Sequence, residues 1–77
     1  MATKVLLFGQ LVEMVGKNTL EMEDVKDTET LQKKLHTNYP TLARAIYCIA
    51  VDKYVVTKNT TLTEETIVAL LPQYAGG

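Results

Sequence analysis

The sequence predicts an α+β fold in which one mixed sheet of about five strands carries one main helix on one of its faces. Two observations predict this fold. Short runs of strand-forming residues stand in both halves of the chain, and a single longer segment between them repeats its apolar residues at helical spacing. A chain of 77 residues makes one small domain with one core.

The first third of the chain predicts a strand, a short helix and a second strand. Residues 3–8 form a mostly apolar run that Gly9 ends. Residues 10–15 carry apolar residues at the helical spacing i, i+3, i+4, and Gly16 stops this helix. Residues 19–22 alternate polar and apolar side chains, which is typical of a half-buried strand.

The main helix is expected to run from Thr28, as its N-cap, to the residue before Pro40. Leu31, Leu35 and Tyr39 recur at intervals of four residues and give the helix one apolar stripe. The helix should end at Tyr39, because the residue before a proline is pushed out of the α region.

The second half predicts one helical turn and three strands, which are residues 41–45, 47–51, 54–56 and 66–71. Asp52-Lys53 predicts a tight connection between two strands. Leu62, within the polar stretch 58–65, is expected to contact the core. If the last strand lies beside the first, with a right-handed crossover, the fold is a β-grasp (ubiquitin-like) roll. We therefore expect a β-grasp domain over residues 1–71 and a flexible C-terminal tail over residues 72–77.

Composition narrows the class of protein. The formal net charge is −1 with no basic block, so we expect no nucleic acid partner. We recognise no signal peptide in the sequence. No apolar run approaches the roughly 20 residues that a membrane span needs, so we expect no membrane partner. Cys48 is the single cysteine, which excludes an internal disulfide and favours a reducing cytoplasm.

Side-chain chemistry predicts no active site of the chain's own. The sequence shows no nucleophile–base pair, paired catalytic acids or glycine-rich phosphate loop. His36 has no Cys or carboxylate at ligand spacing, so a solvated helix surface is expected and not a metal site. Cys48 is expected to be a small buried hydrophobe, with a persulfide relay as the alternative. We expect no bound cofactor.

Strand alternation predicts which side chains face the core. Val5 and Leu7 should face the helix, because their neighbour Lys4 prefers water. The same alternation turns residues 68 and 70 inward. The other face would then carry an exposed apolar patch beside the tail, formed by Phe8, Val55 and Leu71. Such a patch predicts a partner surface; an inverted assignment, with these residues in the core, is the alternative.

The C-terminal segment LPQYAGG ends on Gly76 and Gly77, which cannot pack a core. A frayed terminus is one explanation. The other is that the tail enters a narrow site and reacts there through its main-chain carboxyl, because glycines leave the approach free of side chains.

The stretches KVLLFGQLVEMVG, TLQKKLHTNYP and IVALLPQYAGG resemble the molybdopterin synthase small subunit family of sulfur carriers, along essentially the whole chain. The shared features are the strand end at Phe8-Gly9, the helix end at Tyr39-Pro40, and a hydrophobic residue followed by Pro-x-x-x-Gly-Gly. One departure is Gln73, because the family usually has a second proline there.

This resemblance implies a sulfur carrier without catalytic residues of its own. Gly77 would be adenylated by an E1-like activating enzyme that consumes ATP, and a sulfur-donating enzyme would convert it to a thiocarboxylate. Sulfur would then pass to cyclic pyranopterin monophosphate and form the molybdopterin dithiolene. Gly76 would be the spacer, and the large subunit, in a heterotetramer, would bind Phe8, Val55, Leu71, Pro72, Gln73, Tyr74 and Ala75.

Three alternatives stay open at this point. The first is the related sulfur carrier of the thiazole pathway. The second is a ubiquitin-like protein modifier, in which Gly77 forms an isopeptide with a target lysine. The third is an interaction module whose terminal glycines have no function.

Overall fold

The computed structural model describes residues 2–72, and their elements follow one another in the predicted order. The first half contains β1 (Ala2–Leu7), the short helix α1 (Gln10–Val15), β2 (Thr19–Glu23) and the main helix α2 (Thr28–Asn38). The second half contains the 3₁₀ helix η1 (Pro40–Arg44), β3 (Tyr47–Val51), β4 (Tyr54–Val56) and β5 (Ile67–Pro72). In residues 2–72, neither α-helix has the length and apolar composition that a membrane crossing needs.

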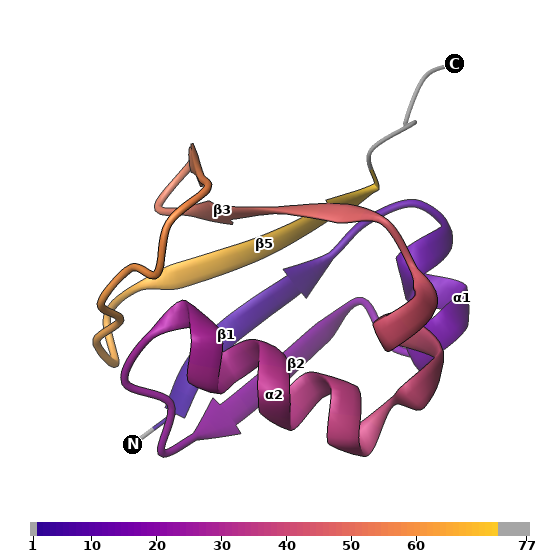
Figure 1. Cartoon of the computed structure of the whole chain (residues 1–77), viewed down its shortest axis with the longest axis horizontal. Coiled ribbons are helices and arrows are strands. Elements are labelled where there is room, and N and C mark those ends of the chain that lie inside the picture. The colour runs from indigo at the N-terminus through magenta and orange to yellow at the C-terminus, as the bar shows by residue number, and fades with distance from the viewer. Residues whose placement is uncertain (1, 73–77) are drawn as a thin grey trace.

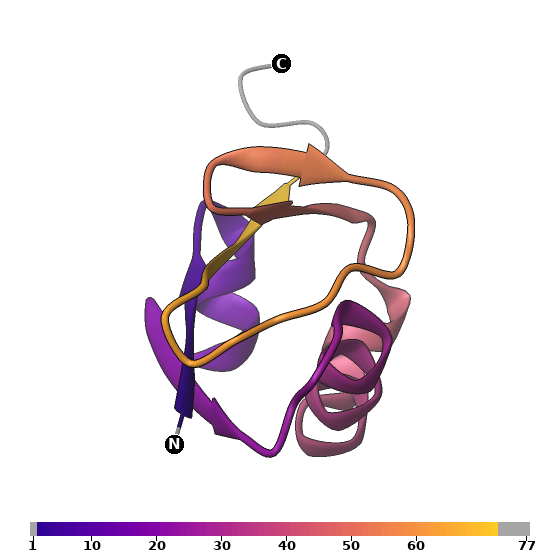
Figure 2. The same ribbon diagram turned by 90° about the vertical axis from the view of Figure 1, so that its left-hand side faces the viewer.

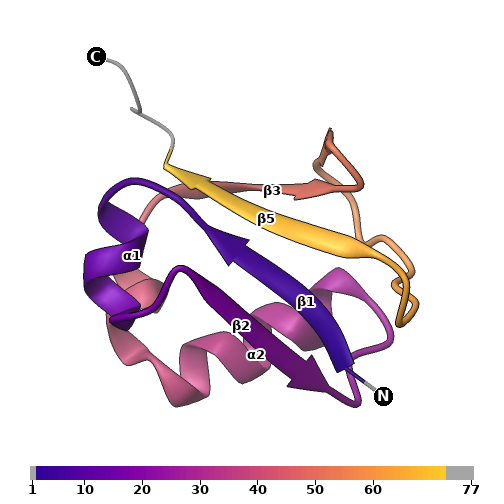
Figure 3. The ribbon, with the colours of Figure 1, turned by 180° about the vertical axis from the view of Figure 1, so that it is seen from behind.

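The strands form one mixed sheet in the order β2-β1-β5-β3-β4. β5 lies between β1, to which it is parallel, and β3, to which it is antiparallel. The last strand therefore lies beside the first, which confirms the predicted β-grasp (ubiquitin-like) fold. Both α-helices lie on the same side of the sheet (Figures 1 and 2), and the sheet is uncovered in the view from behind (Figure 3). We call the helix side the inner face and the other side the outer face.

The core lies between the inner face and α2. The alternation predicted for β1 and β5 is confirmed, because Val5, Leu7, Val68 and Leu70 are at most 2% exposed. The fully buried leucines of both helices and of η1 complete this core, which are Leu11, Leu31, Leu35 and Leu42. Leu62 is buried as predicted, and Tyr39 packs against the core from the end of α2.

The start of α2 differs from the prediction. Asp27, and not Thr28, is the N-cap, because its carboxylate accepts a hydrogen bond of 2.9 Å from the backbone N–H of Thr30. Thr28 is buried, and its hydroxyl turns toward the loop before β5, where it accepts a hydrogen bond from the N–H of Thr60. A contact distant in sequence therefore decides the role of Thr28.

The tight connection between β3 and β4 is confirmed. Asp52 and Lys53 both have positive φ angles, 48° and 76°, as a two-residue hairpin turn of the I′ type requires. The carboxylate of Asp52 accepts a hydrogen bond of 3.0 Å from the N–H of Ile67. This contact joins the hairpin to the start of β5. At its other end β5 continues through Pro72, one residue beyond the predicted strand.

Candidate functional site

The C-terminal segment of the sequence continues from the end of β5. Pro72 is the last described residue and is buried on the inner side of β5. The other five residues of the predicted tail lie outside the described residues, so their roles stay predictions; they are Gln73, Tyr74, Ala75, Gly76 and Gly77.

The outer face carries an apolar hollow of about 480 Å³ close to the end of β5. Seven apolar side chains from four strands and from the residue after β1 line it: Leu6, Phe8, Ala50, Val55, Ile67, Ala69 and Leu71. Phe8 is 45% exposed and Val55 is 59% exposed, although both are large and apolar. Apolar side chains gathered on one face of a small domain indicate a surface that a partner covers. We call these seven residues the outer hollow.

The sheet register explains why these side chains meet. Leu6 of β1 and Ala50 of β3 both lie opposite Ala69 of β5, on either side of it. Ala50 also lies opposite Val55 of β4. Directly opposed residues point to the same face of a sheet. The outer hollow therefore spans four adjacent positions across the sheet, with small alanines at its centre and larger side chains around them.

The structure places the three predicted patch residues together. Phe8, Val55 and Leu71 all line the outer hollow, and their part in binding a partner stays a prediction. The site prediction did not include the other four residues of the hollow, Leu6, Ala50, Ile67 and Ala69. Strand alternation places Leu6, Ile67 and Ala69 on the outer face, but Ala50 depends on the pairing of β3 with β5, which no local pattern reveals.

Charge is sparse at the outer hollow. Asp52 and Lys53, one charge of each sign, stand at its edge on the hairpin turn. Farther along the outer face, Lys4 lies opposite Glu21 in the β1–β2 register. The hollow is therefore apolar at its centre and balanced in charge at its edge.

Two predictions about single side chains need correction. His36 is only partly solvated: it is half-buried, and its Nε2 lies 2.8 Å from the Tyr47 hydroxyl, because that side chain crosses from β3 to α2. Burial raises the pKa of Tyr47. Cys48 is half-buried rather than buried, because β4 pairs only with residues 49–51 of β3 and leaves the strand edge beside Cys48 open.

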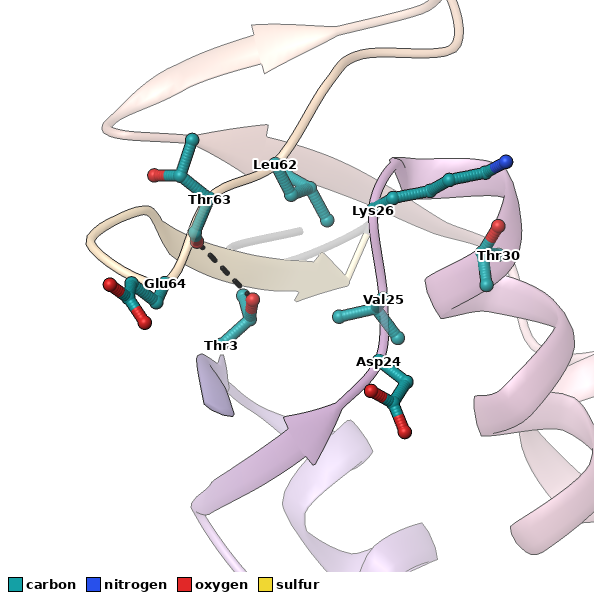
Figure 4. Close-up of a pocket in the computed structure, with 8 residues that line it drawn as sticks. All are labelled: Thr3, Asp24, Val25, Lys26, Thr30, Leu62, Thr63 and Glu64. Atoms are coloured by element: carbon teal, nitrogen blue, oxygen red, sulfur yellow. Dashed lines mark hydrogen bonds between the residues drawn. The ribbon is translucent and has the colours of Figure 1, made fainter. Parts of the chain in front are cut away.

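A hollow larger than the outer hollow lies elsewhere. It measures about 680 Å³ and is formed where the start of β1 meets the loops after β2 and before β5 (Figure 4). Val25 and Leu62 point into it, and the Thr3 hydroxyl donates a hydrogen bond of 3.3 Å to the Thr63 carbonyl across one side. This hollow adjoins the beginning of β5 and so lies at the opposite end of that strand from Pro72. In residues 2–72, no three His, Cys, Asp or Glu side chains are grouped to hold a metal ion.

Comparison with known proteins identifies relatives of this architecture. The sequence profile of the ThiS family matches residues 5–77, nearly the whole chain. Among curated proteins, none matches the sequence.

Solved structures share the fold. Small archaeal modifier protein 1 from Methanosarcina acetivorans has a TM-score of 0.84 at 21% identity, covering 99% of this chain and 96% of its own. A protein assigned as molybdopterin converting factor, subunit 1, from Pyrococcus furiosus has a TM-score of 0.82 at 16% identity, covering 94% and 97%. A chain of the complex of subunits 1 and 2 of molybdopterin-converting factor from Helicobacter pylori 26695 has a TM-score of 0.76 at 22% identity, covering 100% of both chains.

Proposed function

The chain belongs to the ThiS family, and we propose that it is a sulfur carrier whose C-terminal carboxyl, on Gly77, is adenylated and then converted to a thiocarboxylate. The observation that carries this proposal is the apolar outer hollow beside the end of β5, because the segment with Gly76 and Gly77 continues from that strand. A partner bound to the hollow would receive the tail directly.

The carboxyl requires activation because a carboxylate is a poor electrophile. In the proposed first step the Gly77 carboxylate attacks the α-phosphorus of ATP on an activating enzyme, and pyrophosphate leaves. A sulfide equivalent from a sulfur-donating enzyme then attacks the acyl carbon, and AMP leaves with the bonding electron pair. Glycine at the last two positions leaves the approach to both reacting centres free of side chains.

We further propose that the sulfur passes to cyclic pyranopterin monophosphate and forms the molybdopterin dithiolene. The family resemblance of the sequence and the molybdopterin-converting-factor structures of the same fold support this pathway. The Helicobacter pylori structure is a complex of subunits 1 and 2. By analogy the large subunit would cover the outer hollow of this chain, with two carriers on a dimer of large subunits, in a reducing cytoplasm.

Intact mass spectrometry tests the carrier function. After incubation with an adenylating enzyme from the same genome, ATP and sulfide, the mass should rise by about 16 Da, because sulfur replaces one carboxyl oxygen. A chain that ends at Ala75 is the matched control and should show no change. An unchanged mass of the full chain, while the enzyme forms acyl-adenylate on its own known substrate, contradicts the proposal.

Charged substitutions in the outer hollow test the docking surface. Phe8→Asp and Val55→Asp should each weaken binding of the large subunit at least about tenfold, because each places a charge in the apolar contact. Thr41→Asp inserts the same charge at an exposed position of η1 on the helix side and should bind normally. Equal loss in all three variants would contradict docking through the outer hollow. Isothermal titration calorimetry gives these affinities.

A ubiquitin-like modifier is the second candidate function, favoured by the structural likeness to small archaeal modifier protein 1. Here the activated Gly77 carboxyl would form an isopeptide with a lysine of a target protein. Trypsin would leave a Gly-Gly remnant on that lysine only if the residue before Gly76 were cleavable, so an Ala75→Arg variant is the probe. Remnants found in cells would support this function, and thiocarboxylate without remnants would exclude it.

The thiazole pathway is the remaining alternative for a sulfur carrier. Complementation separates it from the molybdopterin pathway: the gene should restore molybdoenzyme activity to a strain without the small synthase subunit. It should not restore thiamine-independent growth to a strain without the thiazole sulfur carrier. The reverse result would assign the thiazole pathway.

A further inference from the structure

Three segments that are distant in sequence meet at Pro72, the last described residue. The connection from β1 to α1, the start of β3 and the end of β5 all lie at the same end of the sheet (Figures 1 and 3). The side chain of Pro72 is buried at this meeting point.

Gly9 lies directly against the proline ring. A Cβ atom built on Gly9 would be 2.6 Å from Cγ of Pro72, closer than real side-chain carbons approach. Gly9 also has a φ of 59° and a ψ of −139°, a backbone conformation available to glycine and strained for L-residues. The close approach and the backbone conformation both require glycine here, and together they bring the β1–α1 connection onto the ring.

Tyr47 borders Pro72 from β3. The two residues are directly opposed in the antiparallel register, so their side chains lie on the same face. The Tyr47 ring is itself held by α2: its hydroxyl lies 2.8 Å from Nε2 of His36 and accepts a hydrogen bond of 3.4 Å from Gln32. The His36 and Tyr47 rings meet edge to face, with centroids 6.2 Å apart.

We propose that Gly9 is a positioning residue for the C-terminal segment: Gly9 and Tyr47 clamp Pro72 and so set the direction in which residue 73 leaves the sheet. A proline has a fixed φ angle, so holding its ring also holds its Cα and carbonyl carbon, the atoms from which residue 73 continues. The role of this clamp in guiding the tail into an activating enzyme rests on the proposed sulfur-carrier function, whereas the clamp itself does not.

The clamp reduces the conformational freedom that the C-terminal segment must lose when it binds a partner. A segment that starts in a fixed direction samples fewer arrangements before binding, and preorganisation of this kind raises affinity without a new contact. Loss of the clamp should therefore raise the KM of the activating enzyme for the carrier about tenfold and leave kcat within about twofold, because the bound state is unchanged.

Gly16 provides the matched control. It ends α1, has a φ of 87°, and has no atom within 4 Å of the position that a Cβ would take. Gly9→Ala and Gly16→Ala both place a side chain at a positive φ, Gly16 in the left-handed helical region with a ψ of 7° and Gly9 outside it with a ψ of −139°. Only Gly9→Ala also overlaps Pro72. Residual dipolar couplings of the amides of residues 73 and 74 should change in Gly9→Ala and stay at wild-type values in Gly16→Ala. Unchanged couplings in Gly9→Ala, or equal changes in both variants, would overturn the clamp.

ATP–pyrophosphate exchange on the activating enzyme, with the full chain as substrate, tests the positioning role. Gly9→Ala should raise KM about tenfold at a temperature where it is fully folded, and Gly16→Ala should not. Pro72→Ala should also raise KM, and the double variant should be no worse than Pro72→Ala, since both changes break one clamp. Additive effects, or a KM of Gly9→Ala equal to wild type, would overturn the positioning role.

The two proposals fail in different ways. If the wild-type chain supports no ATP–pyrophosphate exchange, the sulfur-carrier function falls, and the dipolar couplings still decide whether Gly9 and Pro72 form the clamp. If the wild-type chain is adenylated normally and Gly9→Ala has normal kinetics, the function stands and the positioning role falls.

Discussion

At the scale of single residues, Leu70 and Leu71 have the same chemistry and lie on opposite faces of β5. Leu70 is completely buried in the core, whereas Leu71 is half-buried and lines the outer hollow. The alternation of a strand thus assigns one leucine to stability and its neighbour to the surface that we propose a partner covers.

We predict opposite consequences for the two leucines. Leu70→Ala should lower the free energy of unfolding by about 2–5 kcal/mol, because it leaves a cavity in the core. Leu71→Ala should lower it by less than about 1 kcal/mol and weaken binding of the large subunit. Urea denaturation and calorimetric titration measure the two effects. A Leu71→Ala variant as unstable as Leu70→Ala would show that the outer face is part of the core.

At the scale of elements, the N-terminus of α2 is capped from two places in the chain. Asp27 accepts from Thr30, and the side-chain oxygen of Asn59, in the loop before β5, accepts from the N–H of Glu29 at 3.0 Å. The Asn59 amide also donates to the second oxygen of Asp27 at 3.3 Å. These hydrogen bonds satisfy helix N–H groups that have no partner within the helix, and they attach the loop to α2.

Asn59→Ala should lower the free energy of unfolding by about 1–2 kcal/mol, because it removes one cap and detaches the loop from the helix. Asn18→Ala is the matched control: its side chain accepts only an exposed hydrogen bond from the adjacent Thr19, so the change should stay within about 0.5 kcal/mol. Thermal and urea unfolding measure the free energy of unfolding of both variants. Equal losses in the two variants would contradict the cap.

Asp27 makes the stability of α2 dependent on pH. The pKa of its carboxyl lies below the ordinary value of 3.8, first because of hydrogen bonds from Thr30 and then because of Asn59 and the charge of Lys26. A lowered pKa means that the folded state favours the carboxylate. The contribution of the Asp27 carboxylate to the free energy of unfolding is therefore present above the unfolded pKa and is lost as the pH falls through the lower folded pKa.

NMR titration of the Asp27 side chain checks this prediction. The titration midpoint should lie below 3.8 in the wild-type chain and move upward in Asn59→Ala, because one hydrogen bond to the carboxylate is lost. Asp27→Asn should remove this part of the acid dependence of stability. A midpoint at or above the ordinary value would contradict it.

At the scale of the whole molecule, β5 unites the two halves of the chain. It is paired on one side with β1 from the N-terminal half and on the other with β3 from the C-terminal half, whereas β4 is a three-residue edge strand paired only with β3. The central strand is therefore protected by the entire sheet, and the edge strand by a single neighbour.

Hydrogen exchange should follow this arrangement. The amides of Val68 and Leu70 should exchange only through global unfolding, and those of β4 should exchange at least about 100-fold faster through local opening. Val68→Ala should then accelerate exchange in β1 and β3 together. Equal protection of β4 and β5, measured by NMR, would show that the hairpin of β3 and β4 does not open separately.

Much of this fold and part of its site could be predicted from local pattern. Helix spacing at Leu31 and Leu35, alternation in β1 and the Asp52-Lys53 turn are consequences of neighbours in sequence, and each was confirmed. Alternation also placed Phe8 and Leu71 correctly on the outer face. The sequence by itself determined which side chain of each pair faces the core, because a strand has a period of two and a charged neighbour indicates the wet side.

Only the tertiary structure decided which distant residues meet. Ala50 joins the outer hollow through the register of β3 and β5, His36 is half-buried against Tyr47, and Asn59 caps α2 from the loop before β5. The sequence predicts only that Gly9 ends the first strand. Its contact with Pro72 forms because β5 pairs beside β1. Such contacts depend on strand order and register, which arise from burial of the whole sheet and leave no periodic signal in the residues themselves.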